Sequence, residues 1–253
     1  MYSSYTPTAT STARAAFLRA RPVARWRRAK NWDAHVWDLE RMANSSAFLA
    51  LRDQVLDLAH LRAGDRLLDI GAGTGLLALA AAPRVAHVSA LDVSPAMCGH
   101  LERKFERLGT DNAQVLVNTA TDLPMPDGSV DVVVSNYCFH HLRDTDKVRA
   151  LEQIRRVLRP GGRLVFADMM FRVGVARRRD RAVMALLARR MLRLGPAGLL
   201  RLLKNAIRLL AGRGEHPADA EWWRTTLKRA GFVDVAVQAL EHEGGIARAR
   251  APA

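Results

Sequence analysis

Three regularly spaced glycines, Gly71, Gly73 and Gly75, are the first residues in this chain that could bind a ligand. They follow residues 67–70, an apolar run typical of a buried strand, and precede the good helix formers of residues 76–82. Glycine permits positive φ in such a turn, and the free N–H groups at a helix start can face a ligand. The pattern predicts a ligand-binding loop between a strand and a helix.

A carboxylate follows this loop at a useful distance. Asp92 ends a second apolar run, residues 88–91, about twenty residues after the glycines, where an acid can hold the hydroxyl pair of a ribose. The two runs and the helix between them therefore predict a nucleoside-binding β-α-β unit. A tight turn without a ligand is the alternative for the glycines alone, and Asp92 argues against it.

The glycine spacing separates two kinds of nucleoside-binding loop. A dinucleotide loop reads G-x-G-x-x-G, whereas Asp69 here begins D-x-G-x-G-x-G. This pattern resembles the first motif of the class I methyltransferases that use S-adenosylmethionine, in which the acid lies near the amino group of the donor. The resemblance implies a donor site that includes Asp69, Gly71, Ala72, Gly73, Gly75 and Asp92.

The residues directly after Asp92 extend the resemblance. Ser94 can cap a helix whose first position suits Pro95. In the family, Val93 and Met97 would then pack beside the adenine ring.

Residues 118–124 are similar to the G-D-A-x-x-L-P segment of the family, with one departure. The usual acid, which accepts the adenine amino group, is replaced by Thr119. Either Thr119 or the nearby Asp122 must then do that work, while the backbone N–H of Ala120 could bind the ring.

Polar residues follow the apolar run of residues 130–135, which is typical of a central strand. Ligands of open α/β sheets bind at the carboxyl ends of strands, so Asn136, His140 and His141 should face the donor and the acceptor. An imidazole can accept a proton near neutral pH, and we favour His141 over His140 as a catalytic residue. Helix capping or packing is the alternative role for both histidines.

This segment resembles the small-molecule methyltransferases of the ubiquinone and menaquinone biosynthesis type, in which V-S-N precedes H-H-L. The R-V-L-R-P-G-G signature of residues 156–162 and the A-G-F of residues 230–232 also match. The resemblance covers residues 63–171 and 218–240. It implies a Rossmann-like α/β sandwich with a seven-stranded, mostly parallel sheet, helices on both faces and an antiparallel strand near the end.

The composition is that of a globular protein with one main domain, with 49% hydrophobic and 25% charged residues. The two cysteines, Cys98 and Cys138, lack metal-site spacing, so we expect neither a disulfide framework nor a bound metal. The sequence shows no membrane span and no secretory signal, which predicts a soluble, cytoplasmic protein. An organelle transit peptide is the alternative for the basic N-terminus.

The net charge of +14 is concentrated in two segments. Residues 1–30 contribute +7 and residues 172–213 contribute +11, which leaves −4 for the rest of the chain. Basic segments attract nucleic acid or anionic lipid, but the acidic remainder and the absence of an N-P-P-Y loop argue against nucleic acid. Because only five of the 39 basic residues are lysine, part of the arginine excess can reflect coding bias.

Residues 172–214 are predicted to form a basic helical lid of two helices separated at Gly195 and Pro196. One helix has an apolar side formed by Val183, Met184, Leu187, Met191 and Leu194. The other has an apolar face formed by Leu199, Leu202, Leu203, Ala206, Ile207 and Leu210. Such a lid can cover an apolar acceptor, and its basic side can contact an anionic membrane surface.

The remaining segments complete the predicted organisation. Residues 1–30 are a disordered basic tail, 31–62 an N-terminal helical lid, 63–171 the donor-binding core, 215–241 its closing helix and strands, and 242–253 a tail. Trp32 and Trp37 belong either to the lid or to the core.

The sequence thus predicts methyl transfer from S-adenosylmethionine to a small, apolar oxygen, nitrogen, sulfur or carbon nucleophile. Two alternatives are a nucleic-acid-binding or nucleic-acid-modifying protein, which the charge favours, and a nicotinamide-dependent reductase, which the glycine spacing opposes.

Overall fold

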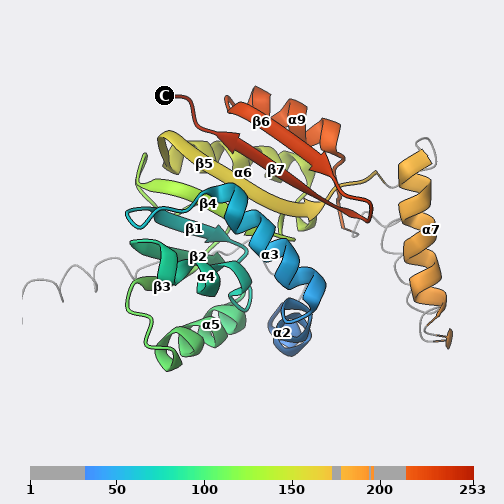
Figure 1. Ribbon diagram of the computed structural model, residues 1–253, viewed down its shortest axis with the longest axis horizontal. Coiled ribbons are helices and arrows are strands. Elements are labelled where there is room, and N and C mark those ends of the chain that lie inside the picture. Colours follow the sequence, from blue (N-terminus) through green and yellow to red (C-terminus); the bar gives the residue numbers. More distant parts are fainter. Residues whose placement is uncertain (1–31, 173–177, 194, 197–214) are drawn as a thin grey trace, which may run out of the picture. The chain divides into compact units, whose positions relative to one another are not determined.

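The centre of the protein is a seven-stranded sheet with the strand order β3-β2-β1-β4-β5-β7-β6 (Figure 1). The structure is a computed structural model that describes residues 32–172, 178–193, 195–196 and 215–253. Pairing is parallel from β3 to β5, whereas β7 is antiparallel to β5 and β6. The strands are β1 (Arg66–Ile70), β2 (His87–Asp92), β3 (Ala113–Val117), β4 (Val130–Asn136), β5 (Leu158–Met169), β6 (Val233–Ala239) and β7 (Gly244–Arg250).

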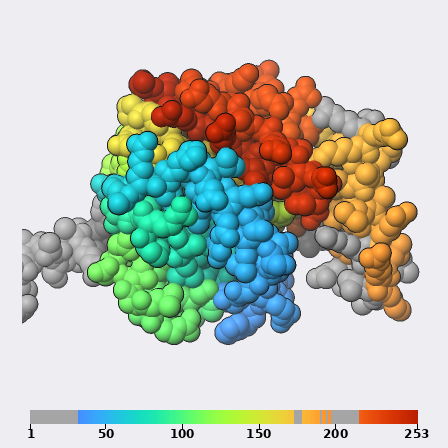
Figure 2. All heavy atoms as spheres, viewed as in Figure 1, coloured from blue at the N-terminus to red at the C-terminus, as the bar shows by residue number. Residues whose placement is uncertain are grey.

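Helices cover both faces of this sheet, which confirms the predicted Rossmann-like sandwich. One core packs α3, α4 and α5 on the sheet, and a second core packs α6 and α9 on the other face. Figure 2 shows α3, in blue and cyan, lying over the first of these faces. The helices are η1 (Trp32–His35), α2 (Val36–Ala43), α3 (Ser46–Ala59), α4 (Leu76–Ala81), η2 (Ala82–Arg84), α5 (Pro95–Arg107), η3 (Phe139–His141), α6 (Asp144–Val157), α7 (Arg178–Leu192) and α9 (Ala220–Arg229).

The strand order reverses beside β1, and this reversal determines where a ligand can enter. β1 pairs with β2 on one side and with β4 on the other, and each neighbour is reached by a crossover in a different direction. The hydroxyl of Ser135 donates to the carbonyl of Ile70 at 2.7 Å, which ties the carboxyl ends of β4 and β1 together. A crevice at such a switch point is where open α/β sheets bind ligands.

The R-P-G-G part of the signature, residues 159–162, lies inside β5. The pairing register shifts here, since Val130 pairs with Leu158 and Val132 already pairs with Arg163. Gly161 takes a φ of +72°, which accommodates the extra residues as a bulge.

The prediction of a tail at residues 242–253 is wrong, because Gly244–Arg250 forms β7 between β5 and β6. Ile246, Ala247 and Ala249 are buried, whereas Arg248 and Arg250 are exposed. Most of the buried residues in this strand are small, so its apolar pattern is weak in the sequence. Its close fit beside β6 also requires Gly245, where a Cβ would overlap Met170 and the carbonyl of Gln238.

The N-terminal helical segment divides into two parts, which corrects the prediction that all of residues 31–62 form a lid. α3 buries Leu51, Val55, Leu56 and Ala59 in the core. In contrast, η1 and α2 contain no buried residue. Trp37 is 73% exposed, so it is not a core residue. Only η1 and α2 therefore remain as candidates for a lid.

The basic segment is described only in part, by α7 and residues 195–196. The predicted helix of residues 199–210 and Leu194 lie outside the described residues. On the predicted apolar side of α7, Val183 is buried and Met184 is exposed. Leu192, which was not part of that side, is exposed as well. Among the residues that the structure describes, no helix has the length and apolar character needed to span a membrane.

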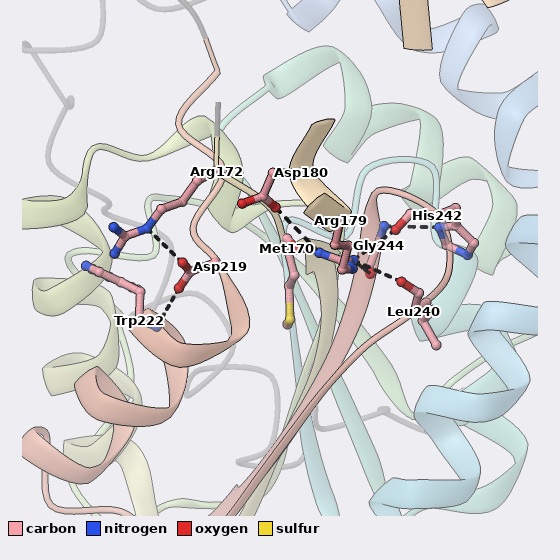
Figure 3. A network of polar contacts seen from close by, with 9 residues as sticks. All are labelled: Met170, Arg172, Arg179, Asp180, Asp219, Trp222, Leu240, His242 and Gly244. Atoms are coloured by element: carbon pink, nitrogen blue, oxygen red, sulfur yellow. Dashed lines mark hydrogen bonds and ion pairs between the residues drawn. The ribbon is translucent and has the colours of Figure 1, made fainter. Parts of the chain in front are cut away.

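The start of α7 is held by one side chain, Arg179 (Figure 3). Its guanidinium donates to the carbonyl oxygens of Met170 (2.7 Å), Leu240 (2.9 Å) and His242 (3.0 Å). Beside it, Arg172 pairs with the buried carboxylate of Asp219 at 2.7 Å. These contacts fix the beginning of the basic segment to the sheet and to α9.

Because β7 is an internal strand, we expect Ile246→Ala to lower the free energy of unfolding by about 2–4 kcal/mol through lost burial and a residual cavity. The control Arg248→Ala removes an exposed side chain of the same strand and should change it by less than about 0.5 kcal/mol. Chemical denaturation measures both, and equal effects would contradict the internal position of β7.

Candidate functional site

The three glycines of the loop after β1 all adopt positive φ, with values of +71° for Gly71, +52° for Gly73 and +95° for Gly75. A Cβ at Gly71 would overlap Cys138, and one at Gly75 would overlap Leu101 of α5. A Cβ at Gly73 would meet nothing within 4 Å. Two glycines are thus required by packing, and Gly73 leaves open space beside the loop where a ligand can approach the backbone.

Asp92 connects this loop to α5. Its two carboxylate oxygens accept hydrogen bonds from the backbone N–H groups of Gly73 and Ser94, each at 2.9 Å. Burial raises the pKa of this carboxyl, and the backbone donors partly oppose that rise. As predicted, Ser94 caps α5, because its hydroxyl accepts from the N–H of Met97 at 3.1 Å. Asp92 remains partly exposed at the crevice, as an acid that binds a ribose must be.

Asp69 lies beneath the loop on the face that α4 covers. It is buried, and one carboxylate oxygen accepts from the N–H of Ala78 at 3.0 Å. Burial raises the pKa of Asp69 to about 7, and the neighbouring charge of Asp92 adds to the rise. A cationic group beside this carboxyl would favour its ionised form and lower its pKa.

The side chain of Thr119 is buried within the loop after β3. Its hydroxyl lies 3.1 Å from the hydroxyl of Thr121, and the N–H of Thr121 donates to it at 3.3 Å. Ala120 is buried beside it, whereas the rival Asp122 is exposed. The role of this loop at an adenine ring stays a prediction, and the burial of Thr119 shows that its hydroxyl already stabilises the loop.

Three further predicted donor-binding residues differ in their surroundings. Met97 is fully buried in the core on the α5 side, while Val93 is partly exposed. Asn136 ends β4, and its buried side-chain oxygen has no hydrogen-bond partner among the described residues. An unsatisfied buried oxygen is costly, so a ligand donor at this point would stabilise it. The unpaired oxygen of Asn136 and the open space at Gly73 are both compatible with a bound nucleoside that donates a hydrogen bond.

The N-terminal segment contacts the same elements. Asp33 of η1 accepts hydrogen bonds from the hydroxyl of Ser94 (2.5 Å) and the N–H of Ala96 (3.2 Å). Glu40 of α2 pairs with Lys104 at 3.0 Å, and Lys104 also donates to the carbonyl of Thr74 in the glycine loop at 2.9 Å. η1 and α2 are therefore attached to the loop that would hold the donor.

His140 and His141 lie together in η3, after β4, with ring centroids 3.8 Å apart. His140 is buried, and its Nδ1 lies 2.5 Å from a carboxylate oxygen of Asp168, which is 0% exposed. Asp168 ends β5, the neighbour of β4, so the fold brings the pair together from residues 28 positions apart. Sequence reasoning placed Asp168 at a strand end but gave it no role. An acid at the carboxyl end of the adjacent strand was the available signal.

His141 faces the N-terminal segment, since its ring packs edge-on against Trp32 with centroids 4.5 Å apart. The rings of Phe48 and Tyr137 pack against each other with centroids 5.1 Å apart, and the ring of Tyr137 contacts that of His140 with centroids 5.9 Å apart. Trp32 is partly buried and belongs to this aromatic surface rather than to either core. Aromatic rings therefore lie around the two imidazoles of η3.

If Asp69 pairs with the amino group of the expected donor, binding must release its proton. We therefore expect the affinity for S-adenosylhomocysteine to fall by up to about tenfold per pH unit below pH 7. Asp69→Asn should bind more weakly and with little dependence on pH. Calorimetric titration across this range is the measurement. A slope that persists in Asp69→Asn would assign it to another group.

The comparisons with known proteins agree with this geometry. The family model described as a methyltransferase domain matches residues 67–162. The chain is 40% identical over 132 residues to a demethylmenaquinone methyltransferase of Thermus thermophilus, covering 51% of this chain and 59% of that protein. It is 35% identical over 142 residues to the 27-O-demethylrifamycin SV methyltransferase of Amycolatopsis mediterranei, covering 53% and 49%. The chain thus spans about half the length of these relatives.

Solved structures share the fold over more of the chain. A SAM-dependent methyltransferase from Aquifex aeolicus has a TM-score of 0.60 at 20% identity, covering 87% of this chain and 98% of that one. A phosphoethanolamine N-methyltransferase of Haemonchus contortus, with S-adenosylhomocysteine bound, has a TM-score of 0.67 at 16% identity, covering 87% and 58%. The matched residues 67–162 contain the glycine loop, Asp92 and both histidines. Residues 67–162 therefore match a methyltransferase domain, and the chain shares the fold of S-adenosylmethionine-dependent methyltransferases.

Proposed function

We propose that this protein transfers the methyl group of S-adenosylmethionine to a small, apolar acceptor bound between η3 and the N-terminal segment. One observation carries the proposal: the donor-type residues and the Asp168–His140 pair meet at the carboxyl ends of adjacent strands β1, β4 and β5. The bound donor would supply an electrophilic methyl group on a positively charged sulfur. The acceptor atom can be oxygen, nitrogen, sulfur or carbon.

The donor would be held by backbone and carboxylate groups. Gly73 leaves its loop open, Asp92 would accept from a ribose, and the buried side-chain oxygen of Asn136 has no hydrogen-bond partner among the described residues. Asp69 would pair with the amino group, and Thr119 and Ala120 would contact the adenine. Fixing both reactants in line can contribute about 7–11 kcal/mol to the rate, so positioning is the main task of these residues.

On the acceptor side, His140 and His141 would promote loss of the acceptor proton. Asp168 orients the His140 ring through Nδ1 and leaves Nε2 as the atom that can act. The rings of Trp32, Phe48 and Tyr137 would exclude water and favour an apolar acceptor. The names of the relatives mention demethylmenaquinone and 27-O-demethylrifamycin SV, which guide the choice of test substrates.

One panel of variants tests the donor-binding residues and the two histidines separately. Calorimetry with S-adenosylhomocysteine and with NADH should detect binding of the first ligand only. Asp92→Asn should weaken this binding by about 1–3 kcal/mol, and Thr119→Ala should cost more than Asp122→Ala. The exposed Asp111→Asn is the matched control and should bind as the wild type does.

In the same panel, His140→Ala and His141→Ala should keep the donor affinity but lose about 10²-fold or more in turnover. Formation of S-adenosylhomocysteine is measured with demethylmenaquinone and with simple apolar phenols, thiols and amines as acceptors. Full turnover in both variants would remove the histidines from the mechanism. Tight NADH binding with no S-adenosylhomocysteine binding would overturn the proposed function itself.

A peripheral, cytoplasmic location at an anionic membrane surface also remains part of this proposal. The described support is α7, where exposed Met184, Leu186 and Leu192 lie among arginines. Binding to vesicles that contain phosphatidylserine should therefore appear in co-sedimentation and fade with salt, since each basic residue contributes roughly 1 kcal/mol near such a surface. Neutral vesicles are the control, and no binding at low salt would leave α7 as a lid with a solvated basic side.

A further inference from the structure

Three side chains at the acceptor end could hold a metal ion. One ligand atom each from His140, His141 and Glu215 lies within 4.8 Å of the others. The histidines are adjacent in η3, whereas Glu215 is far along the chain, just before α9. The sequence analysis expected no metal, because only the fold brings this carboxylate to the histidine pair.

The His140 ring is oriented as a metal ligand usually is. Metal-binding histidines commonly donate their second ring nitrogen to a carboxylate, which fixes the tautomer and makes the free nitrogen a better ligand. Here Nδ1 faces Asp168 at 2.5 Å, and the fully buried Asp168 also accepts from the N–H of Met169 at 2.9 Å. The contact leaves Nε2 of His140 as the ring nitrogen that can bind a metal ion.

Specific contacts of the neighbouring residue, His216, hold the backbone beside Glu215 in place. The next residue, His216, donates its N–H to the carbonyl of His140 at 2.7 Å. The carbonyl of His216 accepts from Lys147 at 2.6 Å. Lys147 is 0% exposed, which is rare for lysine, and its charge is balanced by Asp144 at 2.7 Å. A buried cation therefore fixes the backbone that carries Glu215 against the backbone of His140.

We propose that His140, His141 and Glu215 bind one divalent transition-metal ion that takes a hydroxyl acceptor as a further ligand. Two imidazoles and one carboxylate suit zinc, manganese, cobalt or iron, and three protein ligands leave positions open for a substrate oxygen. This inference rests on the proposed function and deepens it, since the histidines would promote loss of the acceptor proton through the ion.

Methyl transfer at such a metal site would conserve atoms and electrons. The metal-bound hydroxyl has a lowered pKa and releases its proton to solvent. The oxygen then forms a bond to the methyl carbon as the carbon–sulfur bond breaks, and the electron pair of that bond goes to sulfur. The products are a methyl ether, S-adenosylhomocysteine and the released proton, with no oxidant or reductant needed. The acceptor class implied is a phenol, enol or hydroxyquinone with an oxygen that can bind a metal.

Cobalt(II) is the probe, because bound cobalt gives visible absorption. Full-length, tag-free protein is treated with a chelator, dialysed and titrated with cobalt(II) by absorption and calorimetry. We expect about one equivalent to bind, and Glu215→Gln or His141→Ala should weaken binding about 10- to 100-fold. Glu152→Gln, an exposed glutamate on α6, is the matched control and should bind as the wild type does.

The affinity for S-adenosylhomocysteine, measured on the same samples, separates this inference from the proposed function. Lost cobalt binding with an intact donor affinity in Glu215→Gln supports the metal site. No bound cobalt in the wild type, or equal cobalt affinity in Glu215→Gln and the wild type, overturns the metal site but leaves the methyltransferase proposal standing. Absent donor binding in the wild type would instead contradict the proposed function.

Discussion

The hydrogen bonds of Asp92 are the constraint on which the donor side of this protein depends. One carboxylate oxygen holds the N–H of Gly73, and the other holds the N–H of Ser94 at the start of α5. The loop after β1 and the helix after β2 are thereby fixed to one side chain at the end of β2. Charge-assisted hydrogen bonds of this kind are stronger than neutral ones, which compensates in part for the burial of the carboxylate. The N-terminal segment extends the same arrangement, since Asp33 binds Ser94 and Lys104 binds Thr74.

A second carboxylate, the buried Asp168, holds the proposed acceptor side. Asp92 at the end of β2 and Asp168 near the end of β5 lie on opposite sides of the β1–β4 pair, so one sheet carries both acids. The two acids differ in their partners, because Asp92 binds backbone donors and Asp168 binds an imidazole. Backbone donors fix the shape of a loop, whereas an imidazole can also exchange a proton or hold an ion. Under the proposed function, Asp92 would help to hold one reactant and Asp168 would help to activate the other.

Much of this fold could be predicted from the sequence, because its central strands are continuous apolar runs between clear turn residues. The glycine loop, Asp92, the Ser94 cap and the histidine pair all belong to short local patterns. β7 could not be predicted in the same way, since Ala247 and Ala249 are small and give a weak alternation with Arg248. Asp168 and Glu215 were missed for a different reason. Their roles arise from strand adjacency and from the Lys147 contact to His216, which join residues far apart in the chain.

The contacts of the basic segment have a consequence for how such a protein can diversify. Arg172 and Arg179 attach its beginning to Asp219 and to the carbonyls around Gly244, and Asp219 itself caps α9 by accepting from Trp222 at 2.8 Å. The described attachments thus lie at the beginning of the segment, next to the sheet. If the segment covers the acceptor, substitutions, insertions or deletions beyond Arg179 would alter the acceptor that is admitted while the donor-binding loops keep their shape. The segment would then be an exchangeable module, and Arg172 and Arg179 are the residues that such an exchange must retain.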